Sequence, residues 1–563
     1  MPFASEHPPL VVPETDILSY LFARGPRTDK PLWIDSRRPS ESISARQALE
    51  WVRRLGFGLE RLGLRRGDVV AICTPNHIWV PVAFLGIAGA GFVFSGASPA
   101  FTVRELAYQL ANSMAKAILV HPTVLEPALE AAAQVGLPKD RIFQFSDKAC
   151  QTRHGVDDWT AMIGTRQQGD GWQWPTLGTG EAARALAAIN YSSGTTGLPK
   201  GVCISHANLI TNLEQTIFVN YGGTRSSGPR LEERWIGFLP LFHAYGQLFM
   251  ILMAAKLGVP VYVMAQFALT DFLAVIERHR ITSLHTVPPV LVMLAKRPET
   301  SHYDLSSIRD VVCGAAPLSR ELQNECQVRL GCQIRQAWGM TEATCTCAMT
   351  PVGFRDQSGS VGKLVPNCEA KLVDDDGHEA EAGQRGEMFI RGPNVCLGYW
   401  RSEQATRDTI DSQGWLRTGD IAIRNDDGLV YIVDRKKDFI KVNALQVAPA
   451  ELEAALLENE HVADAAVVGI TLAEGNERPR AYVVIQVASR STVTPDSIRT
   501  WIASRVSKHK RLEGGVVFVD EIPKLPSGKI KRRMLRERAR RETMELQGHK
   551  ESGGDGVRLK PSL

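Results

Sequence analysis

The sequence lacks the patterns that mark secreted, membrane-spanning and nucleic-acid-coating proteins. Its N-terminus has no apolar segment after a basic start, which a signal peptide requires. The most apolar stretch, 248–263, is interrupted by Lys256 and Pro260 and is shorter than the ~20 residues of a membrane helix. The 65 basic and 61 acidic residues leave a formal charge of +4, too small to suggest a nucleic-acid partner. We therefore expect no signal peptide, no membrane span and no nucleic-acid binding.

Paired cysteines and a targeting signal at the C-terminus are also lacking. The ten cysteines are spread along the chain, and the one close pair, Cys345 and Cys347, has no second pair to accompany it. This spacing indicates neither a disulfide framework nor a zinc site, and it favours a reducing compartment. The last residues, 560–563, do not form the peroxisomal Ser-Lys-Leu signal. A cytoplasmic location is the resulting expectation.

Short apolar runs alternate with helical patterns through most of the chain. At ~150 residues per domain, 563 residues correspond to three or four folding units, and the 44% hydrophobic content allows large cores. Runs separated by helical stretches are typical of a parallel sheet with crossover helices. The fold class predicted is α/β with two stacked α/β units. The runs read as strands are 68–73, 92–97, 115–120, 235–240, 259–264 and 308–315, and 79–91 reads as a helix.

The pattern changes after Leu364, where short strands separated by Asp-Gly turns predict hairpins. We place a β-rich subdomain at about 360–433, at the end of an N-terminal domain that covers 1–433. The charged segment 434–441 is interpreted as a hinge, and 442–538 as a smaller, mobile α+β domain. The polar, Gly/Ser-rich residues 539–563 are expected to be a disordered tail.

The densest functional signal is the segment 191–201, YSSGTTGLPKG, which follows an apolar run that predicts a strand. Glycines let backbone N–H groups surround an anion, while hydroxyls and Lys200 add donors and charge. The spacing resembles a Walker A loop, but Pro199 and Gly201 replace its final Gly and its Ser/Thr. We therefore predict a polyphosphate-binding loop that is not an ordinary P-loop. The residues assigned to it are Ser192, Ser193, Gly194, Thr195, Thr196, Gly197 and Lys200.

This segment resembles the signature of the acyl-adenylate-forming (ANL) superfamily, which contains acyl-CoA synthetases, luciferases and peptide-synthetase adenylation domains. Similar blocks recur in order from about Asn76 to Lys529, and their pattern is most similar to the 4-coumarate–CoA ligase type. The resemblance implies an N-terminal AMP-binding domain and a mobile C-terminal domain. It also implies ATP, Mg²⁺ and, as co-substrate, CoA.

Two blocks resemble the family's nucleotide-binding segments. In residues 336–343, QAWGMTEA, an aromatic ring at Trp338 can stack on adenine, Thr341 can donate to a phosphate, and Glu342 offers a hard oxygen ligand for Mg²⁺. Trp338 and Ala337 stand where relatives carry Tyr and Gly. The resemblance places Gly314, Ala315 and Gly339 near the adenine and the acyl group.

Three catalytic residues are implied by the resemblance. His243, in the block 239–246, matches the histidine that contacts the phosphates and the substrate carboxylate. Lys529, in the block 522–530, matches the lysine that bridges this carboxylate and the α-phosphate. Lys441 matches a position that contacts the adenylate, although a charged linker is the alternative reading of its segment.

Further binding roles carry over in the same way. Asp420 and Arg435 match the residues that contact the ribose, and Lys437 matches the pivot of the hinge. Gln446 matches a second adenylate contact. The weaker assignments are contacts to CoA. Asn443 and Ala444 are two of them, and relatives usually have Gly where this chain has Ala444. The third is Lys256, for which a snorkelling side chain at a helix end is the alternative.

The acyl pocket implied by the resemblance involves Tyr245, Ala337, Cys345 and Thr346. Cys345 and Thr346 replace the Pro-Val of the plant enzymes, which argues against a strict hydroxycinnamate enzyme. The predicted function is an acid–CoA ligase that acts on an aryl or medium-chain carboxylic acid. Two alternatives remain: an adenylating enzyme that loads the thiol of a carrier protein, and a non-catalytic nucleotide-binding paralogue.

Overall fold

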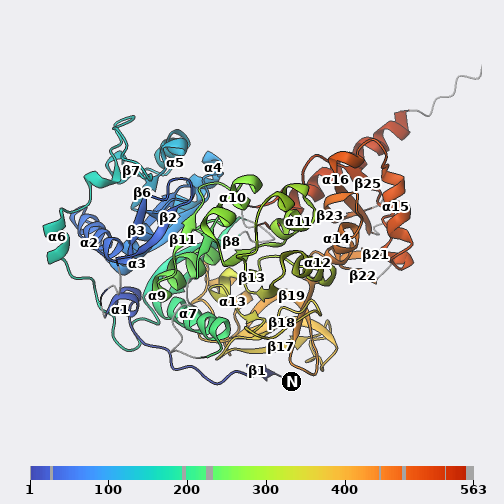
Figure 1. The fold of residues 1–563 in the computed structure, drawn as a ribbon, viewed down its shortest axis with the longest axis horizontal. Coiled ribbons are helices and arrows are strands. Elements are labelled where there is room, and N and C mark those ends of the chain that lie inside the picture. Colours follow the sequence, from blue (N-terminus) through green and yellow to red (C-terminus); the bar gives the residue numbers. More distant parts are fainter. Residues whose placement is uncertain are drawn as a thin grey trace, which may run out of the picture.

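The computed structural model describes residues 2–23, 25, 29–192, 198–223, 233–442, 445–471, 477–525 and 528–552, with side chains described as far as 543. Two large sheets with their helices lie beside an antiparallel sheet, and a smaller α+β unit is attached at one end (Figure 1). This is the α/β architecture that the sequence predicts.

The first sheet has six strands in the order β7-β6-β4-β5-β8-β9, and only β9 runs antiparallel to its neighbour. Its central strands are continuous apolar runs because helices cover both faces. The strands are β4 Val69–Cys73, β5 Val93–Ala97, β6 Ala117–Val120, β7 Ile142–Gln144, β8 Leu186–Ser192 and β9 Lys200–Ser205. The nearby helices are α2 Ala45–Arg61, α3 Val80–Gly89, α4 Val103–Ser113, α5 Leu125–Gln134 and α6 Arg166–Gly171.

The second sheet has nine strands in the order β16-β15-β14-β13-β12-β10-β11-β2-β3, of which β14, β13, β12, β10, β11 and β2 are parallel. Its strands are β2 Pro31–Asp35, β3 Ser42–Ser44, β10 Trp235–Gly237, β11 Val261–Val263, β12 Ser283–Thr286, β13 Asp310–Cys313, β14 Gln333–Trp338, β15 Ala348–Met349 and β16 Lys363–Leu364. Helices α10 Leu269–His279, α11 Pro288–Lys296 and α12 Arg320–Leu330 supply an apolar cluster with these strands.

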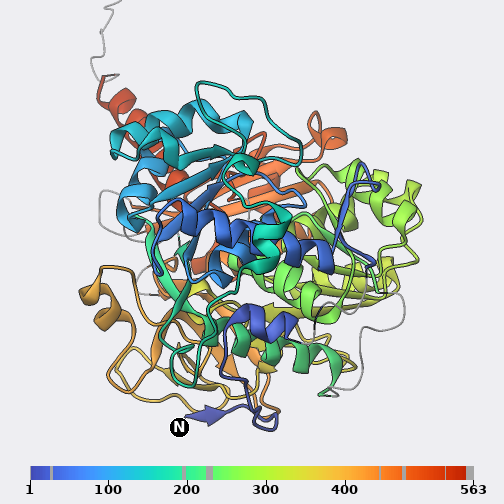
Figure 2. The ribbon, with the colours of Figure 1, turned by 90° about the vertical axis from the view of Figure 1, so that its left-hand side faces the viewer.

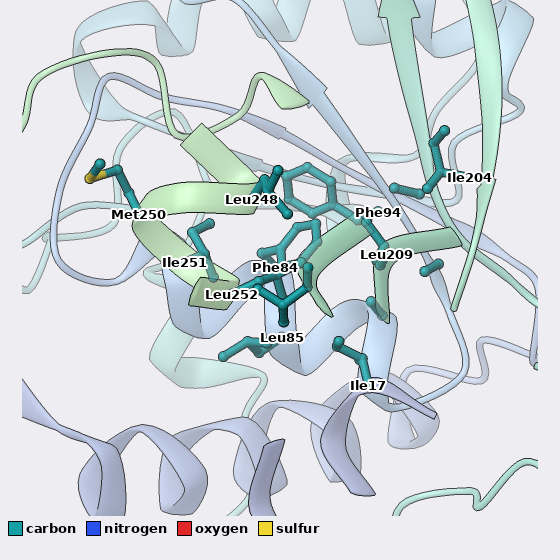
Figure 3. Close-up of a cluster of buried hydrophobic side chains, with 14 of the residues drawn as sticks. Ile17, Phe84, Leu85, Phe94, Ile204, Leu209, Leu248, Met250, Ile251 and Leu252 are labelled. Carbon is teal, nitrogen blue, oxygen red and sulfur yellow. The ribbon is translucent and has the colours of Figure 1, made fainter. Parts of the chain in front are cut away.

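The main core lies between the two sheets. Figure 3 shows Phe84 of α3 and Phe94 of β5 beside Leu248 and Ile251 of a π-helix, η4 Gln247–Met253. The same cluster includes residues of α1 Ile17–Phe22, α7 His206–Tyr221 and α9 Ala254–Leu257. The most apolar stretch of the sequence is thus core. Over the described residues, no helix has the length and apolar composition needed to cross a membrane.

The third sheet is antiparallel, in the order β1-β17-β18-β19-β20. Strands occur where the Asp-Gly turns predict hairpins. An unexpected addition is β1, which pairs with β17 from the other end of the domain and lies at the sheet's edge (Figure 2). The elements are β1 Phe3–Ala4, β17 Glu369–Val373, β18 Arg385–Arg391, α13 Glu403–Thr409, β19 Leu416–Arg424 and β20 Val430–Arg435.

The C-terminal unit packs helices against a small sheet in the order β23-β24-β25. Its elements are β21 Ile440–Val442, β22 Leu445–Val447, α14 Pro449–Leu457, β23 Val462–Thr471, β24 Glu477–Ile485, α15 Pro495–Ala503, β25 Val516–Phe518 and α16 Arg532–Ser552. The short elements that complete the chain are η1 Pro122–Val124, η2 Lys139–Arg141, η3 Trp159–Ala161, α8 Ala244–Gly246, η5 Pro298–His302, η6 Thr341–Ala343, η7 Val487–Ser489 and η8 Lys508–Lys510.

Helix α16 corrects one prediction. The sequence suggested a disordered tail from Ala539, but the helix continues to Ser552. Ala539 is fully buried, and the carboxylate of Glu542 accepts hydrogen bonds from Arg480 (3.1 Å) and from the hydroxyl of Tyr482 (2.9 Å). Contacts to β24 therefore hold a segment whose composition alone suggested disorder.

Candidate active site

The predicted phosphate-binding loop connects two antiparallel strands. Ser192 ends β8, Lys200 begins β9, and the two residues are cross-strand partners. The five residues between them that we assigned to phosphate binding, 193–197, lie outside the described residues. Both ends of the loop lie near Glu342. The hydroxyl of Ser192 donates to Glu342 directly. The Lys200 ammonium lies 4.8 Å from the ring centre of Tyr399, whose hydroxyl also donates to Glu342.

Glu342 is a buried carboxylate on η6. Its Oε1 accepts hydrogen bonds from the hydroxyls of Ser192 and Tyr399, each at 2.9 Å. Burial and the neighbouring carboxylate raise the pKa of Tyr399 well above its ordinary value, so the phenol stays a donor. A carboxylate held in this way suits a hard cation. Tyr399 was not predicted, because it follows no motif and reaches Glu342 from 57 residues away.

At the carboxyl ends of β13 and β14, close approaches of the backbone leave space only for small residues. A Cβ on Gly339 would lie 1.6 Å from the carbonyl oxygen of Cys345, and one on Gly314 would lie 3.3 Å from that of Ala337. Ala315 has a left-handed φ of 71°, which costs energy for a residue other than glycine. The small residues at 314 and 339 thus allow two close backbone contacts.

Asp420 is the centre of the predicted ribose site. It is buried on β19, directly opposite Arg435 on β20, and its Oδ1 lies 3.2 Å from the Arg435 Nε. Its Oδ2 accepts a hydrogen bond of 2.9 Å from the indole N–H of Trp338. The edge of the indole is therefore fixed by the carboxylate, which joins the predicted adenine and ribose contacts into one unit.

His243 begins the short helix α8, and its Nδ1 accepts the N–H of Tyr245 at 3.4 Å. Burial, with the charge of Lys529 as a second cause, lowers the pKa of His243 to about 4. The imidazole is therefore neutral near pH 7. The hydroxyl of Tyr245 donates to the carbonyl of Val312 at 3.3 Å, which places this ring beside β13.

Lys529 reaches the same place from the C-terminal unit. Burial and the charge of Arg435 lower its pKa, whereas Asp420 and Glu342 act in the opposite direction. The charge of Lys529 also acts on His243 and on Cys345, whose pKa burial raises to about 12. The structure thus brings together residues from distant blocks that were assigned to one centre.

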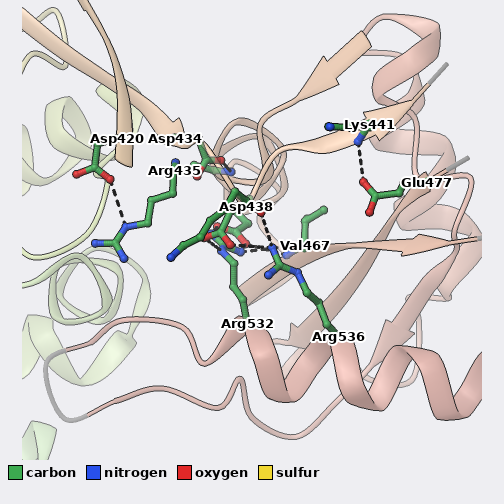
Figure 4. A network of polar contacts seen from close by, with 12 residues as sticks. Asp420, Asp434, Arg435, Asp438, Lys441, Val467, Glu477, Arg532 and Arg536 are labelled. Carbon is green, nitrogen blue, oxygen red and sulfur yellow. Dashed lines mark hydrogen bonds and ion pairs between the residues drawn. The ribbon is translucent and has the colours of Figure 1, made fainter. Parts of the chain in front are cut away.

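The connection between β20 and β21 carries a network of charges, drawn in Figure 4. Asp434 is buried, which raises its pKa to about 6, and its Oδ2 accepts the N–H of Ala450 at the start of α14. Asp438 forms ion pairs with Arg532 (3.5 Å) and Arg536 (2.7 Å) of α16. The predicted hinge is therefore tied to the helix that follows Lys529.

Some predicted residues lie elsewhere. Lys441 and Gln446 are exposed cross-strand partners on β21 and β22; the N–H of Lys441 donates to Glu477, and the side chain of Gln446 contacts Asp375. Lys256 packs its ammonium 3.5 Å from the ring centre of Tyr20 on α1, which supports a structural role and not the weak CoA assignment. Asn443 and Ala444 lie outside the described residues.

The remaining pocket residues line the interior. Thr341 and His243 border a cavity of about 50 Å³. Thr346 is buried, and its N–H donates to the side chain of Asn212 on α7, which in turn donates to the carbonyl of Thr346 at 2.7 Å. Asn212 therefore fixes the segment that holds Cys345 and Thr346, a role that no local pattern indicated.

Comparison with known proteins matches two parts of the chain to family models. Residues 22–400 match the model of the AMP-binding enzyme family, and residues 451–529 match that of the AMP-binding enzyme C-terminal domain. The chain is 38% identical to the phenylacetyl-CoA ligase epaB of Aspergillus niger over 94% of its length and 97% of that protein. It is 35% identical to 4-coumarate-CoA ligase 1 of Narcissus pseudonarcissus, over 95% and 96% of the two chains.

A solved structure shares the whole architecture. ATP-bound MatB from Rhodopseudomonas palustris matches with a TM-score of 0.79 and 26% sequence identity, covering 93% of this chain and 98% of that one. The likeness therefore includes both the nucleotide-binding part and the C-terminal unit that carries Lys529.

Proposed function

Because the chain belongs to the AMP-binding enzyme family and is an ATP-dependent, AMP-forming acid–CoA ligase, we propose that it activates an aryl or medium-chain acid where Lys529, His243 and Glu342 meet. The observation that carries this proposal is the position of Lys529. A lysine of the C-terminal unit lies close enough to His243 and Cys345 to change their pKa values.

The first half-reaction joins two anions, a carboxylate and ATP. Such a step needs fixed positive charge and alignment more than covalent catalysis. Lys529 would bridge the acid and the α-phosphate, while Lys200 and the loop of 193–197 would hold the outer phosphates. Neutral His243 would donate or accept a hydrogen bond without adding to the charge. Attack of the carboxylate oxygen on the α-phosphorus would then release pyrophosphate and leave acyl-AMP.

The donor set around Glu342 fits Mg²⁺. A buried carboxylate, with its two hydroxyl donors both on Oε1, is the hard oxygen ligand that this ion prefers. Glu342 would hold the ion, which when bound would neutralise charge on the phosphates. The nucleoside would be held by the unit of Asp420, Arg435 and Trp338, through the ribose hydroxyls and the adenine.

The second half-reaction would transfer the acyl group to the thiol of CoA. We propose that the C-terminal unit turns about Lys437 and withdraws Lys529, which would bring the β21–β22 hairpin to the site. Lys441, Gln446 and the residues Asn443 and Ala444 would then face the adenylate and the pantetheine arm. This rotation explains why Lys441 and Gln446 lie apart from Lys529 in the present arrangement.

The acid would lie against Tyr245, Ala337, Cys345 and Thr346. The similarity to a phenylacetyl-CoA ligase favours an aryl acid. Cys345 and Thr346 stand in place of the Pro-Val of the plant-type pattern. We therefore propose an acid other than a hydroxycinnamate as the preferred substrate.

A substrate panel tests the proposal. The purified protein would receive ATP, Mg²⁺ and single aryl or aliphatic acids, and acid-dependent ATP–pyrophosphate exchange would be measured. At least one aryl or medium-chain acid should give exchange, and added CoA should then yield AMP and thioester in equal amounts. Background AMP formation with every acid would show the proposal to be wrong. Thioester formation on a carrier protein but not on CoA would favour the alternative acceptor.

A further inference from the structure

Helix α11 lies where the C-terminal unit meets the rest of the molecule (Figure 1). The chain enters it at Val287, and a Cβ on Gly528 would lie 3.1 Å from the Val287 Cγ2 and 3.5 Å from the Pro289 Cδ. Gly528 directly precedes Lys529. The first turn of α11 is therefore one wall against which the loop that carries Lys529 rests.

The other end of α11 makes a second contact with the same unit. Lys296, its last residue, directs its ammonium to three backbone carbonyls at the end of α14 and the start of β23. These belong to Leu457, to Asn459 at 3.3 Å and to Val462 at 3.2 Å. The ammonium thus contacts three neighbouring acceptors, all of which belong to the C-terminal unit.

The carbonyl of Leu457, the last residue of α14, is suited to a cation. The last carbonyls of a helix have no partner within the helix, and the C-terminal end carries partial negative charge. Leu457 is also packed against the apolar cluster formed by α10, α11 and α12, so its side chain enters the N-terminal part beside Lys296. Lys296 is itself partly buried, and this burial lowers its pKa, while Glu325 and Glu458 act in the opposite direction.

The two contacts lie at opposite ends of a nine-residue helix, about 13 Å apart. Two separated points define an orientation, whereas one point would allow rotation about it. The helix itself is anchored, because Arg329 of α12 donates to the carbonyls of Ala295 and Arg297. A contact at Lys296 can therefore hold the position of the loop at Gly528.

We propose that Lys296 is a positioning residue for adenylation, which docks the C-terminal unit on α11 so that Lys529 stays in the active site. This inference rests on the proposed function, because it assigns Lys296 to the first half-reaction and not to the second. Lys296 touches no reacting group and acts only through Lys529. Rotation of the unit for thioester formation would separate Lys296 from its three carbonyls.

The experiment compares Lys296→Met with Lys296→Arg and Lys510→Met. Lys510 is the matched control, since its ammonium pairs with Glu451 of the same helix α14 (2.6 Å) but stays within the C-terminal unit. With the most active acid of the panel, Lys296→Met should slow ATP–pyrophosphate exchange by tenfold or more, because it removes the hydrogen bonds of a charged group to the C-terminal unit. Thioester formation from the supplied acyl-adenylate should be unchanged or faster. Lys296→Arg should recover part of the exchange, and Lys510→Met should change neither reaction.

Amide hydrogen exchange of the ligand-free, full-length proteins gives a readout independent of activity. Residues 288–297 and 449–462 should exchange faster in Lys296→Met than in the wild type, and Lys510→Met should match the wild type. Unchanged amide exchange, or an equal loss of both half-reactions, would overturn the inference. A wild type without any acid-dependent activity would instead refute the proposed function, and the amide exchange would still decide the docking role.

Discussion

His243 and Lys529 are close enough for the charge of the lysine to act on the histidine, whose imidazole is neutral near pH 7. Burial is the larger cause of the low pKa of His243, about 4, and Lys529 adds to it. A neutral imidazole beside a cation can approach phosphates without repelling the lysine. Burial and then the charge of Arg435 lower the pKa of this lysine, whereas nearby Asp420 and Glu342 act in the opposite direction.

A test of this electrostatic arrangement is the pH dependence of stability. The folded pKa of His243 lies below the ordinary 6.5, so the folded protein binds fewer protons than the unfolded one between pH 4 and 6.5. Stability from this residue is present above that window and is lost as the pH falls through it. The wild type should therefore lose up to about 3 kcal/mol more than His243→Asn between pH 7 and 4. Urea denaturation at several pH values measures this; parallel curves for the two proteins would contradict it.

The Tyr399 hydroxyl supports the carboxylate of Glu342, and its removal should weaken ATP use. Tyr399→Phe takes away one of two hydrogen bonds to a buried charged group, which is worth about 1–2 kcal/mol. We expect kcat/KM for ATP in pyrophosphate exchange to fall by about 5- to 30-fold. Tyr431→Phe is the control, because its hydroxyl donates to exposed Ser358. Equal activity of the two variants would show that the Tyr399 hydroxyl does not contribute to ATP use.

At the scale of elements, the ends of β13 and β14 set the shape of the nucleotide and acyl sites. Gly339→Ala should be strongly destabilising or inactive, because the new Cβ would meet the carbonyl of Cys345. Overpacking of this kind costs about 1–3 kcal/mol, and backbone cannot move aside as a side chain can. Gly171→Ala, which meets no atom within 4 Å, is the matched control. Thermal unfolding and pyrophosphate exchange measure both effects; a Gly339→Ala protein with normal values in both would refute the close approach.

The elements that the sequence predicted best are the buried strands. Runs such as those of β4 and β6 are apolar throughout, because parallel strands covered on both faces need apolar residues at every position. Strand β1 had no such signal: it is two residues long and pairs with Ala370. Helix α16 was misread because its charges suggest solvent, while its contacts to β24 come from 60 residues earlier in the chain.

The candidate site was predicted to the extent that its residues belong to motifs. Glu342, Asp420 and Lys529 lie in recognisable blocks, and the structure brings them together. Tyr399, Asn212 and Lys296 could not be found in this way, because each acts through a partner distant in the sequence and has no pattern around it. Local sequence constrains motifs and periodicity, but it does not encode which loops meet in space.

At the scale of the whole molecule, catalysis depends on how the C-terminal unit sits on the larger part. In this structure Lys529 lies near Asp420 and Glu342, while Gly528 lies against Val287 and Asp434 accepts the N–H of Ala450. Lys441, which we propose for the second half-reaction, is exposed in this arrangement. The arrangement therefore holds Lys529, proposed for adenylation, in the candidate site, while Lys441, proposed for thioester formation, lies at the surface.

Lys529→Met separates the two steps. Loss of the ammonium should slow acid-dependent pyrophosphate exchange by about 100- to 1000-fold, the usual effect of removing a group aimed at transition-state charge. Thioester formation from supplied acyl-adenylate should stay within about twofold of the wild type, because that step would use the unit in its other orientation. Lys524→Met is the control, since its ammonium pairs with Asp464 inside the C-terminal unit (2.6 Å). If Lys529→Met lost both half-reactions equally, the lysine would serve the fold or both steps, and adenylation would need another source of positive charge.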